Sequence, residues 1–163
     1  MSKGGIYPGT FDPITFGHID IIKRSLKIVK KLIVAVSDDN TKKYFFSGEE
    51  RVSLIKDSLF TDLNFNRQDI KIVYFNTLTT YLCRKHKATT LFRGLRAASD
   101  FEYEFQLAGM NRKLDKTIET VFLMADVDKQ VISSKFVKEI AKLNGKIDNF
   151  VTKSVIRAIK NKI

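Results

Sequence analysis

Short hydrophobic runs alternate along this chain with longer segments in which hydrophobic residues recur at every third or fourth position. The short runs are mostly continuous and rich in β-branched or aromatic residues, which is typical of strands buried on both faces of a sheet. This pattern predicts five strands. The first ends at Tyr7, and the others cover 31–37, 70–75, 89–92 and 120–124.

The segments with the longer repeat predict amphipathic helices between and after these strands. Ser47, followed three residues later by Glu50, predicts a capping box at the start of the second helix. Ser133 or Ser134 is expected to cap the fifth helix, and Gly145 is expected to end it. The hydrophobic positions of the predicted helices are Ile19, Ile22, Leu26 and Val29; Val52, Ile55 and Leu59; 78–87; Phe101, Phe105 and Ala108; Phe136, Val137, Ile140 and Leu143; and Val155, Ile156 and Ile159.

The alternation of strands and helices predicts an α/β fold in a single domain, 1–163. Five βα units in succession imply a five-stranded, parallel, doubly wound (Rossmann-like) sheet with right-handed crossovers and helices on both faces. The length of 163 residues and the hydrophobic content of 44% suit one domain with one sizeable core. In such sheets, ligands bind beyond the carboxyl ends of the strands, near the point where the strand order reverses.

The connection after the first predicted strand has the composition of a constrained loop. The chain contains only two prolines, Pro8 and Pro13, and both lie here, where their fixed φ angles favour an irregular path. Gly9 and Gly17 let the backbone turn sharply or let a ligand approach closely, and Gly17 with His18 is expected to open a helix. Because the free N–H groups of a helix start favour anions, this loop predicts a phosphate site. An ordinary βα connection with a helix-opening histidine is the alternative.

The charge balance narrows the possible partners. The formal net charge is +11, and the isoelectric point is near 9.7. A basic surface attracts nucleic acid, anionic membranes or small phosphorylated ligands. The lysines are scattered without a long basic tail, so we expect neither a nucleic acid nor a membrane as partner. Arg93 and Arg96, three residues apart beside a glycine, instead indicate phosphate binding, because the planar guanidinium suits phosphate oxygens.

Other classes of protein fit the sequence poorly. The single cysteine, Cys83, cannot form an internal disulfide, and the first residues lack the apolar segment of a secretory signal. The longest aliphatic run, 32–36, is far shorter than the roughly 20 residues that span a bilayer. We therefore expect a soluble, cytoplasmic protein. The sequence has neither a Cys and His spacing typical of metal sites nor a clustered Ser, His and Asp arrangement.

Several short motifs follow the constrained loop along the chain. They are Lys42-Lys43, Glu49-Glu50-Arg51, Arg93-Gly94-Leu95-Arg96, 100–104 and Ile132-Ser133-Ser134. The loop segment 9–18 is similar to the (H/T)xGH signature of the nucleotidyltransferase superfamily, and the later motifs resemble, in order and near spacing, those of bacterial phosphopantetheine adenylyltransferases. The resemblance covers essentially the whole chain. Each motif alone is modest, but their ordered combination is specific.

This resemblance implies a reaction and its requirements. The family transfers the adenylyl group of ATP to the phosphate of 4'-phosphopantetheine, giving dephospho-coenzyme A and pyrophosphate in coenzyme A biosynthesis. The resemblance also implies a homohexamer and Mg²⁺ bound mainly through the ATP phosphates. Because the acceptor phosphate is already a nucleophile, direct in-line attack needs neither a covalent intermediate nor a catalytic base. Catalysis would rest on alignment and on donors and cations that stabilise the transition state.

The same resemblance assigns residues to roles. His18 is the catalytic residue that stabilises the transition state, and Thr10 positions the attacking phosphate. The substrate-binding positions for the acceptor are Thr10, Lys42, Thr79 and Arg93. The nucleotide-binding positions are Thr10, Phe11, His18, Gly94, Leu95, Arg96, Glu104, Lys129, Gln130, Val131, Ile132, Ser133, Ser134 and Lys135. No protein ligand to a metal is expected.

Three positions depart from the family pattern. The Ile-Ser-Ser motif is commonly preceded by an aromatic residue and followed by a hydroxyl residue, but Lys129 and Lys135 hold those places here. Thr79 stands where a more apolar side chain is usual. A lysine at a helix start can still reach a phosphate, and we expect Lys135 to contact ATP.

Two alternatives compete with this hypothesis. A sibling nucleotidyltransferase acting on nicotinamide mononucleotide or glycerol phosphate would share His18 and the serine motif, but the motifs within 93–104 favour phosphopantetheine. A basic nucleic-acid-binding module without catalysis would suit the charge of +11 and Lys135. That second alternative leaves the set of Thr10, His18 and Arg93 unexplained.

Overall fold

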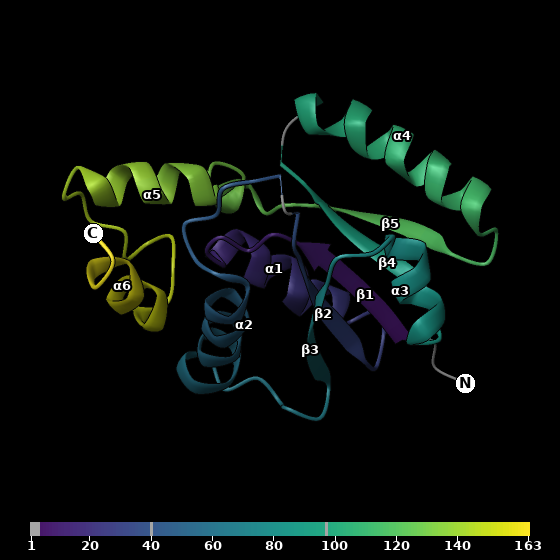
Figure 1. Cartoon of the computed structure of the whole chain (residues 1–163), viewed down its shortest axis with the longest axis horizontal. Helices are drawn as coiled ribbons and strands as arrows, with labels where there is room; N and C mark the ends of the chain where they lie inside the picture. Colours follow the sequence, from purple (N-terminus) through teal and green to yellow (C-terminus); the bar gives the residue numbers. More distant parts are fainter. Residues whose placement is uncertain (1–3, 40, 97) are drawn as a thin grey trace.

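Five parallel strands form one sheet in the computed structural model, which describes residues 4–39, 41–96 and 98–163, with the backbone alone for 98–100 (Figure 1). The strand order is β3-β2-β1-β4-β5, so β1 lies in the centre. The strands are β1 Gly4–Gly9, β2 Leu32–Ser37, β3 Ile70–Phe75, β4 Ala88–Leu95 and β5 Glu119–Met124. These bounds confirm the five predicted strands.

Helices cover both faces of the sheet, as predicted. Among the described residues they are α1 Phe16–Ser25, α2 Gly48–Lys56, α3 Thr79–Lys85, α4 Ala98–Leu114, α5 Ser134–Lys142 and α6 Lys153–Lys160. A π-helical turn, Asp57–Asp62, extends α2, and a 3₁₀ turn, Val127–Lys129, follows β5. The predicted capping box is present: Ser47 accepts from the Glu50 N–H, and Glu50 accepts from the Ser47 N–H.

β4 extends further than predicted. Its last residues, 93–95, pair in register with 122–124 of β5. This neighbouring strand supplies hydrogen-bond partners that keep the backbone extended. Arg93 and Gly94 therefore lie inside the strand, not in the connection that follows it.

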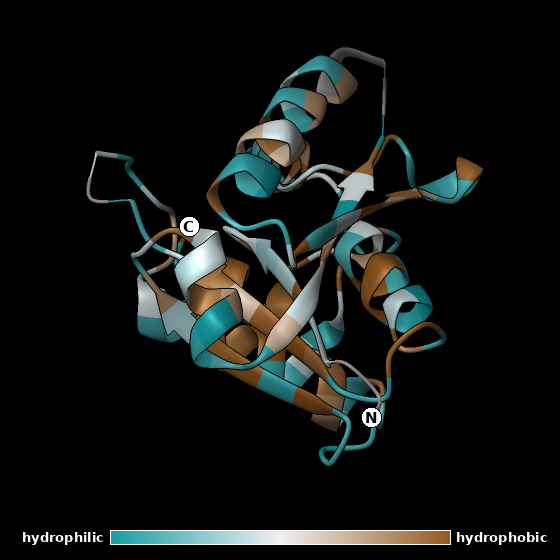
Figure 2. Ribbon diagram, turned by 90° about the vertical axis from the view of Figure 1, so that its right-hand side faces the viewer, coloured by the Kyte–Doolittle hydropathy of each residue, from teal (hydrophilic) through white to brown (hydrophobic). Residues whose placement is uncertain are grey.

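Alternate residues of each strand pack on opposite faces of the sheet. Leu32, Val34 and Val36 of β2 belong to a core that α1, α2, α5 and α6 cover. Ala35 belongs to a second core covered by α3, with Ile33 packed against it. In Figure 2 the helices alternate between hydrophobic and hydrophilic colours along their turns, as expected for helices that pack through one face. Burial on both faces explains the nearly continuous hydrophobic runs of the strands.

Two turns use residues other than the glycines that the sequence suggested. All glycines of the chain lie in the described residues, and none of them has a positive φ. Phe11 (φ 49°) and Asn144 (φ 58°) instead adopt the left-handed backbone conformation. Asn144 therefore reverses the chain after α5, and the prediction that Gly145 ends this helix is wrong. Gly145 is instead needed for space, because an added Cβ would lie 2.5 Å from Cγ2 of Ile140. In the same way Phe11, not Gly9, makes the turn after β1.

The helix α6 docks on the π-helical turn that follows α2. The hydroxyls of Ser58 and Thr152 form a buried hydrogen bond of 2.7 Å. The Ser154 N–H, in the first turn of α6, donates to the Asp62 carboxylate at 2.9 Å. Val155 and other hydrophobic residues of α6 enter the larger core. Polar and apolar contacts thus hold α6 in place together.

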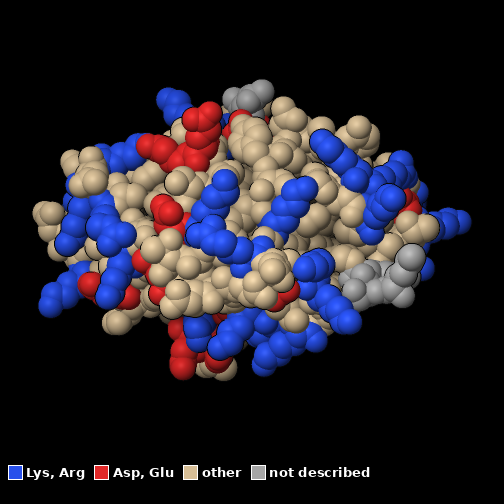
Figure 3. Space-filling view, turned by 90° about the horizontal axis from the view of Figure 1, so that it is seen from below, with Lys and Arg blue, Asp and Glu red and all other residues tan. Residues whose placement is uncertain are grey.

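The surface is basic over a wide area. Figure 3 shows Lys and Arg side chains spread across one face, with fewer Asp and Glu side chains between them. This distribution agrees with the scattered lysines of the sequence. Within the described ranges, no helix is both long and apolar enough to cross a membrane.

Candidate active site

The carboxyl ends of β1 and β4 lie where the strand order reverses, and the predicted catalytic residue, His18, lies near this point with two predicted binding residues, Thr10 and Arg93. Thr10 follows β1, and His18 lies in the first turn of α1. Arg93, near the end of β4, donates from Nη1 to the Pro8 carbonyl oxygen of β1 at 3.2 Å. This hydrogen bond joins β4 to β1 at Pro8, two residues before Thr10. The position follows the rule for ligand sites in open parallel sheets.

His18 is held through its Nδ1 atom at the start of α1. The Thr15 N–H donates to Nδ1 at 3.1 Å, and the Thr15 hydroxyl oxygen lies 3.1 Å from the same atom. Because a backbone N–H can only donate, Nδ1 must accept, and the hydrogen of the neutral ring then lies on Nε2. The Phe11 ring packs edge-on against the imidazole, with centroids 5.0 Å apart. His18 therefore carries a fixed Nε2–H donor. α1 begins at Phe16, slightly before the predicted Gly17.

The His18 ring is neutral at physiological pH. Loss of hydration and the nearby positive charge of Arg96 lower its pKa to about 4, from an ordinary value of 6.5. A neutral ring donates a hydrogen bond without carrying a charge. This state suits a donor that stabilises developing negative charge, and it does not suit a general acid.

Arg93 and Glu104 form a two-pronged ion pair that fixes the guanidinium. Arg93 Nε lies 2.7 Å from one carboxylate oxygen of Glu104, and Nη2 lies 2.5 Å from the other. A guanidinium has five N–H groups. These two bonds and the bond to Pro8 use three of them within the described part of the chain, which leaves two for a ligand. Glu104, a buried residue of α4, thus orients the arginine that is predicted to hold the acceptor phosphate.

Thr10 and Phe11 differ in what they can offer a ligand. Thr10 is exposed, so its hydroxyl is accessible. Phe11 is fully buried, and its ring packs against those of Tyr7 and His18. A contact between Phe11 and a nucleotide would therefore go through the backbone of Phe11.

The stretch 94–96 combines close packing with an exposed cation. Gly94 lies inside β4, where an added Cβ would come 3.0 Å from Cγ1 of Ile21 in α1. A side chain at this position would push the helix away from the sheet. Leu95 is buried, and Arg96 is exposed just beyond the strand.

The predicted nucleotide segment 129–135 leads into α5 and is anchored to the loop after β1. Ser133 is the N-cap of α5, and its hydroxyl accepts from the Phe136 N–H at 3.2 Å. Ser134 donates to the Pro13 carbonyl oxygen at 2.7 Å. Of the two serines expected to cap this helix, Ser133 does so, and Ser134 joins α5 to the β1–α1 connection.

The other side chains of this segment differ in exposure. Val131 and Lys135 are exposed, and Ile132 is buried. Lys129 forms an ion pair with Asp126, which lies before the segment, and Gln130 donates to the Ala125 carbonyl oxygen. The Lys135 ammonium lies 4.0 Å from a carboxylate one turn further along α5, and its side chain is 81% exposed. Contact with ATP would require this side chain to turn toward the start of the helix.

Two predicted acceptor-binding residues lie beyond β2 and β3. Lys42 is exposed in the connection after β2, with Nζ 3.6 Å from Asp39. Thr79 is the first residue of α3. A cavity of about 410 Å³, which we call the β2–β3 cavity, is lined by residues that are near both of them in sequence. It is lined by Ser37, Asp38, Asp39, Thr41, Phe75, Asn76 and Thr77.

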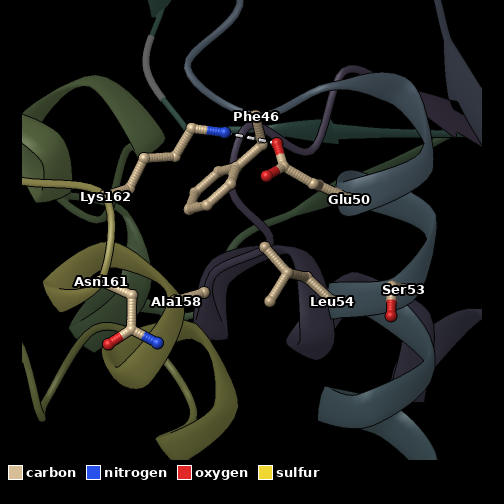
Figure 4. A pocket seen from close by; sticks show the side chains of 7 residues that line it. All are labelled: Phe46, Glu50, Ser53, Leu54, Ala158, Asn161 and Lys162. Atoms are coloured by element: carbon tan, nitrogen blue, oxygen red, sulfur yellow. Dashed lines mark hydrogen bonds and ion pairs between the residues drawn. The ribbon is translucent and has the colours of Figure 1, made fainter.

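A second cavity, of about 350 Å³, lies between α2 and α6, where none of the predicted residues is found (Figure 4). Phe46 and Leu54 point toward it, and an ion pair between Lys162 and Glu50 crosses its edge. Because the positive charge of Lys162 is already paired, this cavity offers no uncompensated charge to a ligand.

A completely buried arginine lies close to Thr10, and the sequence motifs predicted no role for it. Arg51 of α2 donates to the Thr10 carbonyl oxygen at 2.8 Å. A signal for its burial was present, because Arg51 lies four residues before Ile55 and eight before Leu59, on the hydrophobic face of the predicted helix. An arginine on such a face needs buried acceptors.

Asp12 is a second buried charge for which the sequence predicted no role. Its carboxylate accepts from the backbone N–H groups of Phe45 and Phe46, each at 2.8 Å. It also accepts from Lys138 of α5 at 2.9 Å. These bonds join the loop after β1, the segment before α2 and α5. No pattern in the sequence indicates a pair separated by so much of the chain.

The side chains at the carboxyl ends of β1 and β4 do not form a metal-binding group. Among the described residues, no three His, Cys, Asp or Glu side chains are placed together to hold an ion. The site instead offers hydroxyls, a neutral imidazole and cations. These groups fit a Mg²⁺ ion that arrives on phosphate oxygens and keeps water ligands.

Hydrogen-bond donors and cations, placed where the strand order of a parallel sheet reverses, suit a nucleotidyltransferase. Comparison with known proteins supports this class. The chain matches the family described as cytidylyltransferase-like over residues 6–140. A phosphopantetheine adenylyltransferase of Pelagibacter ubique is 59% identical over 162 residues, which are 99% of each chain. Another, from Sphingopyxis alaskensis, is 48% identical over 155 residues, 95% of this chain and 90% of that one. The chain therefore belongs to the cytidylyltransferase-like family and, within it, to the phosphopantetheine adenylyltransferases.

A solved structure agrees with the fold. A Vibrio parahaemolyticus protein, described as a candidate nicotinate-nucleotide adenylyltransferase, superposes with a TM-score of 0.72 at 17% identity. The match covers 99% of this chain and 93% of that one. The two proteins thus share their α/β fold.

Proposed function

We propose that this chain transfers the adenylyl group of ATP to the phosphate of 4'-phosphopantetheine, giving dephospho-coenzyme A and pyrophosphate. The observation that carries the proposal is the neutral Nε2–H donor of His18, which Thr15 fixes at the carboxyl end of the central strand. The names of relatives that are 59% and 48% identical support this pair of substrates and a place in coenzyme A biosynthesis.

The proposed reaction is a direct in-line displacement. An oxygen of the acceptor phosphate attacks the α-phosphorus of ATP, and the bond from that phosphorus to the bridging oxygen breaks and releases pyrophosphate. The attacking oxygen is already anionic, so no base has to remove a proton. The His18 Nε2–H donates to an α-phosphate oxygen, on which negative charge develops in the transition state. The exposed hydroxyl of Thr10 orients the attacking phosphate.

The acceptor extends across the ends of β1, β2 and β3 in this proposal. The two remaining N–H groups of Arg93 and the ammonium of Lys42 hold its phosphate. The β2–β3 cavity receives the pantetheine arm, with Thr79 two residues beyond the cavity lining. Neighbouring strands lie about 4.8 Å apart, so an elongated acceptor can reach from the reaction centre to this cavity.

ATP binds on the opposite side of the reaction centre, at the ends of β4 and β5. The start of α5, capped by Ser133, directs free backbone N–H groups toward the triphosphate. The proposed contacts are Thr10, Phe11, His18, Gly94, Leu95, Arg96, Glu104 and residues 129–135. Mg²⁺ arrives with ATP and neutralises charge on the phosphate oxygens.

The assembly in this proposal is a homohexamer. Several large hydrophobic side chains on α4 are exposed in the single chain. They are Phe101, Tyr103, Phe105, Met110 and Leu114, with exposed fractions between 46% and 66%. Exposed hydrophobic side chains in such number on one helix are typical of a protein contact, and association with further copies of the chain would bury them.

One assay tests the proposed function. Pyrophosphate release from ATP and Mg²⁺ is measured with and without 4'-phosphopantetheine, and we expect release only when the acceptor is present. Excess chelator should abolish it. Turnover with nicotinamide mononucleotide or glycerol 3-phosphate in place of 4'-phosphopantetheine would favour a sibling activity. Steeply salt-dependent binding of nucleic acid, with no turnover of ATP, would favour the binding module.

A further inference from the structure

A completely buried guanidinium connects the ends of β1 and β2. Arg51 of α2 donates from Nη1 to the carbonyl oxygens of Thr10 and Ser37, both at 2.8 Å. Thr10 follows β1, and Ser37 is the last residue of β2. One nitrogen atom therefore fixes the backbone at the ends of two neighbouring parallel strands.

The other terminal nitrogen of the guanidinium and its face also have partners. Arg51 Nη2 donates to the Asp38 carboxylate at 3.2 Å, and the Tyr44 ring lies 4.0 Å from the guanidinium carbon. Tyr44 is held in turn, because its hydroxyl accepts from the Asp39 N–H at 2.9 Å. The planar group thus has bonds in its plane and an aromatic ring over its face.

Burial of this charge costs desolvation free energy, which an apolar residue would not cost. A buried ion contributes little to net stability compared with a well-packed hydrophobic side chain of the same volume. A guanidinium can, however, hold two carbonyl oxygens and a carboxylate in fixed positions at once. The geometry therefore points to a role in alignment.

We infer that Arg51 is a positioning residue for the proposed reaction, because it holds Thr10 in register with the wall of the β2–β3 cavity. Thr10 carries the hydroxyl that orients the attacking phosphate, and Ser37 and Asp38 line the cavity that receives the acceptor. Arg51 bonds to all three residues. The inference rests on the proposed function, and it assigns to Arg51 the alignment of acceptor with reaction centre.

The expected defect is larger for the acceptor than for ATP, because Ser37 and Asp38 line the acceptor cavity and only Thr10 is shared with the proposed ATP contacts. The bonds of Arg51 join β1, β2 and the connection after β2, on the acceptor side of the reaction centre. Lysine keeps the positive charge but offers one nitrogen and no planar fork, so it cannot hold the same three groups. Displacement of a reacting group by about 1 Å can lower turnover by about 100-fold.

The test compares full-length wild type with Arg51→Lys in the pyrophosphate-release assay, at a temperature where both are folded by circular dichroism. We expect kcat to fall by about 10- to 100-fold. The KM for 4'-phosphopantetheine should rise by about fivefold or more, and the KM for ATP should stay within about twofold. A merely structural role would not separate the two KM values.

Ser58→Ala is the matched control for lost stability. It removes a buried hydroxyl bond to Thr152 close to α2 but touches neither Thr10 nor the β2–β3 cavity. This variant should unfold at lower temperature and keep kcat and both KM values within about twofold of wild type.

Tyr44→Leu tests the inference should Arg51→Lys fail to fold. It removes the ring over the guanidinium and leaves Arg51 in place, so we expect the same rise in acceptor KM at smaller size. Tyr44→Phe, which keeps the ring, should show less of it. Wild-type values for folded Arg51→Lys, wild-type values for Tyr44→Leu, or equal rises in both KM values would each overturn the role of Arg51. An inactive wild type would instead overturn the proposed function, and this inference with it.

Discussion

At the scale of single residues, the two ring nitrogens of His18 have different roles. Nδ1 is occupied by Thr15 within the first turn of α1, and the ring is braced by Phe11. Nε2 alone remains for chemistry, and it carries a hydrogen because Nδ1 accepts. A donor fixed before the ligand arrives needs no reorganisation when charge develops on the α-phosphate.

Replacement of His18 by alanine should affect turnover much more than binding. We expect His18→Ala to lower kcat by about 100-fold, because a donor aimed at developing charge contributes mainly to the transition state. ATP affinity, measured by calorimetry, should change by less than about threefold. The control is His86→Ala, which replaces the chain's other histidine at the end of α3. Equal losses of ATP affinity and turnover in His18→Ala would contradict the assignment.

The low pKa of His18 predicts a loss of stability in mild acid. The pKa is about 4 in the folded protein and near 6.5 in the unfolded chain. Between these values the unfolded chain binds more protons, so the free energy of unfolding falls as the pH falls through this window. The contribution of His18 amounts to about 1 kcal/mol between pH 7 and pH 5.5.

Urea unfolding of ligand-free wild type and His18→Gln at both pH values measures this term. Glutamine does not titrate, so the variant should lose about 1 kcal/mol less than wild type on acidification. Other groups contribute equally to both proteins. An identical pH dependence would mean that His18 titrates near its ordinary pKa when folded.

Long-range polar links determine how the elements meet around the site. Asp12, in the loop after β1, accepts from Lys138 of α5 and from two N–H groups of the segment before α2. Ser134 adds a second link from α5 to the same loop. The helix that is proposed to receive the triphosphate is thus attached to the loop that carries Thr10.

Loss of the lysine from this link should destabilise the fold. Lys138→Met leaves Asp12 with its two backbone donors but without its cation, and we expect a loss of about 2 kcal/mol in the free energy of unfolding. Lys142→Met, at an exposed position of the same helix, should change it by less than about 0.5 kcal/mol. Urea unfolding at pH 7 gives both values. Equal effects of the two substitutions would argue against the importance of the link.

The sequence was sufficient for the elements and for part of the site. Strands buried on both faces carry continuous hydrophobic runs, and the rule for parallel sheets predicted a ligand site at the carboxyl ends of the strands, where Thr10 and Arg93 lie. The bonds of Arg51 and Asp12 could not be predicted, because they join residues 41 and 126 positions apart through tertiary packing. The turns at Phe11 and Asn144 were missed because these residues take a conformation that glycine usually takes.

At the scale of the whole molecule, the sheet is covered on both faces, but α4 still carries exposed hydrophobic side chains. These side chains lie on the helix that supplies Glu104 to Arg93. Association through α4 would therefore occur close to the site, and it would restrain the helix that orients the arginine.

Substitution of the exposed residues of α4 should weaken self-association. Met110 and Leu114 lie four residues apart on one face of the helix and are 59% and 50% exposed. Burial of each contributes about 1.5 to 3 kcal/mol, so Met110→Ser with Leu114→Ser should shift the proposed hexamer toward smaller species in sedimentation velocity. Leu143→Ser, which replaces an 83% exposed leucine after α5, is the control and should leave the distribution unchanged. A wild type that sediments as a single chain would contradict the proposed assembly.

The central position of β1 also has a consequence for synthesis on the ribosome. β1 is made before the other four strands of the sheet. It can pair with β2 once residue 37 is available, but its other edge stays open until β4 is complete at residue 95. At about 5 to 20 residues per second, this interval lasts roughly 3 to 12 seconds. A hydrophobic edge in the middle of the future sheet is unpaired during that time, so the nascent chain is then most prone to aggregate. Thr10 and His18 are thus synthesised early, but the proposed site is complete only after Arg93 has been added.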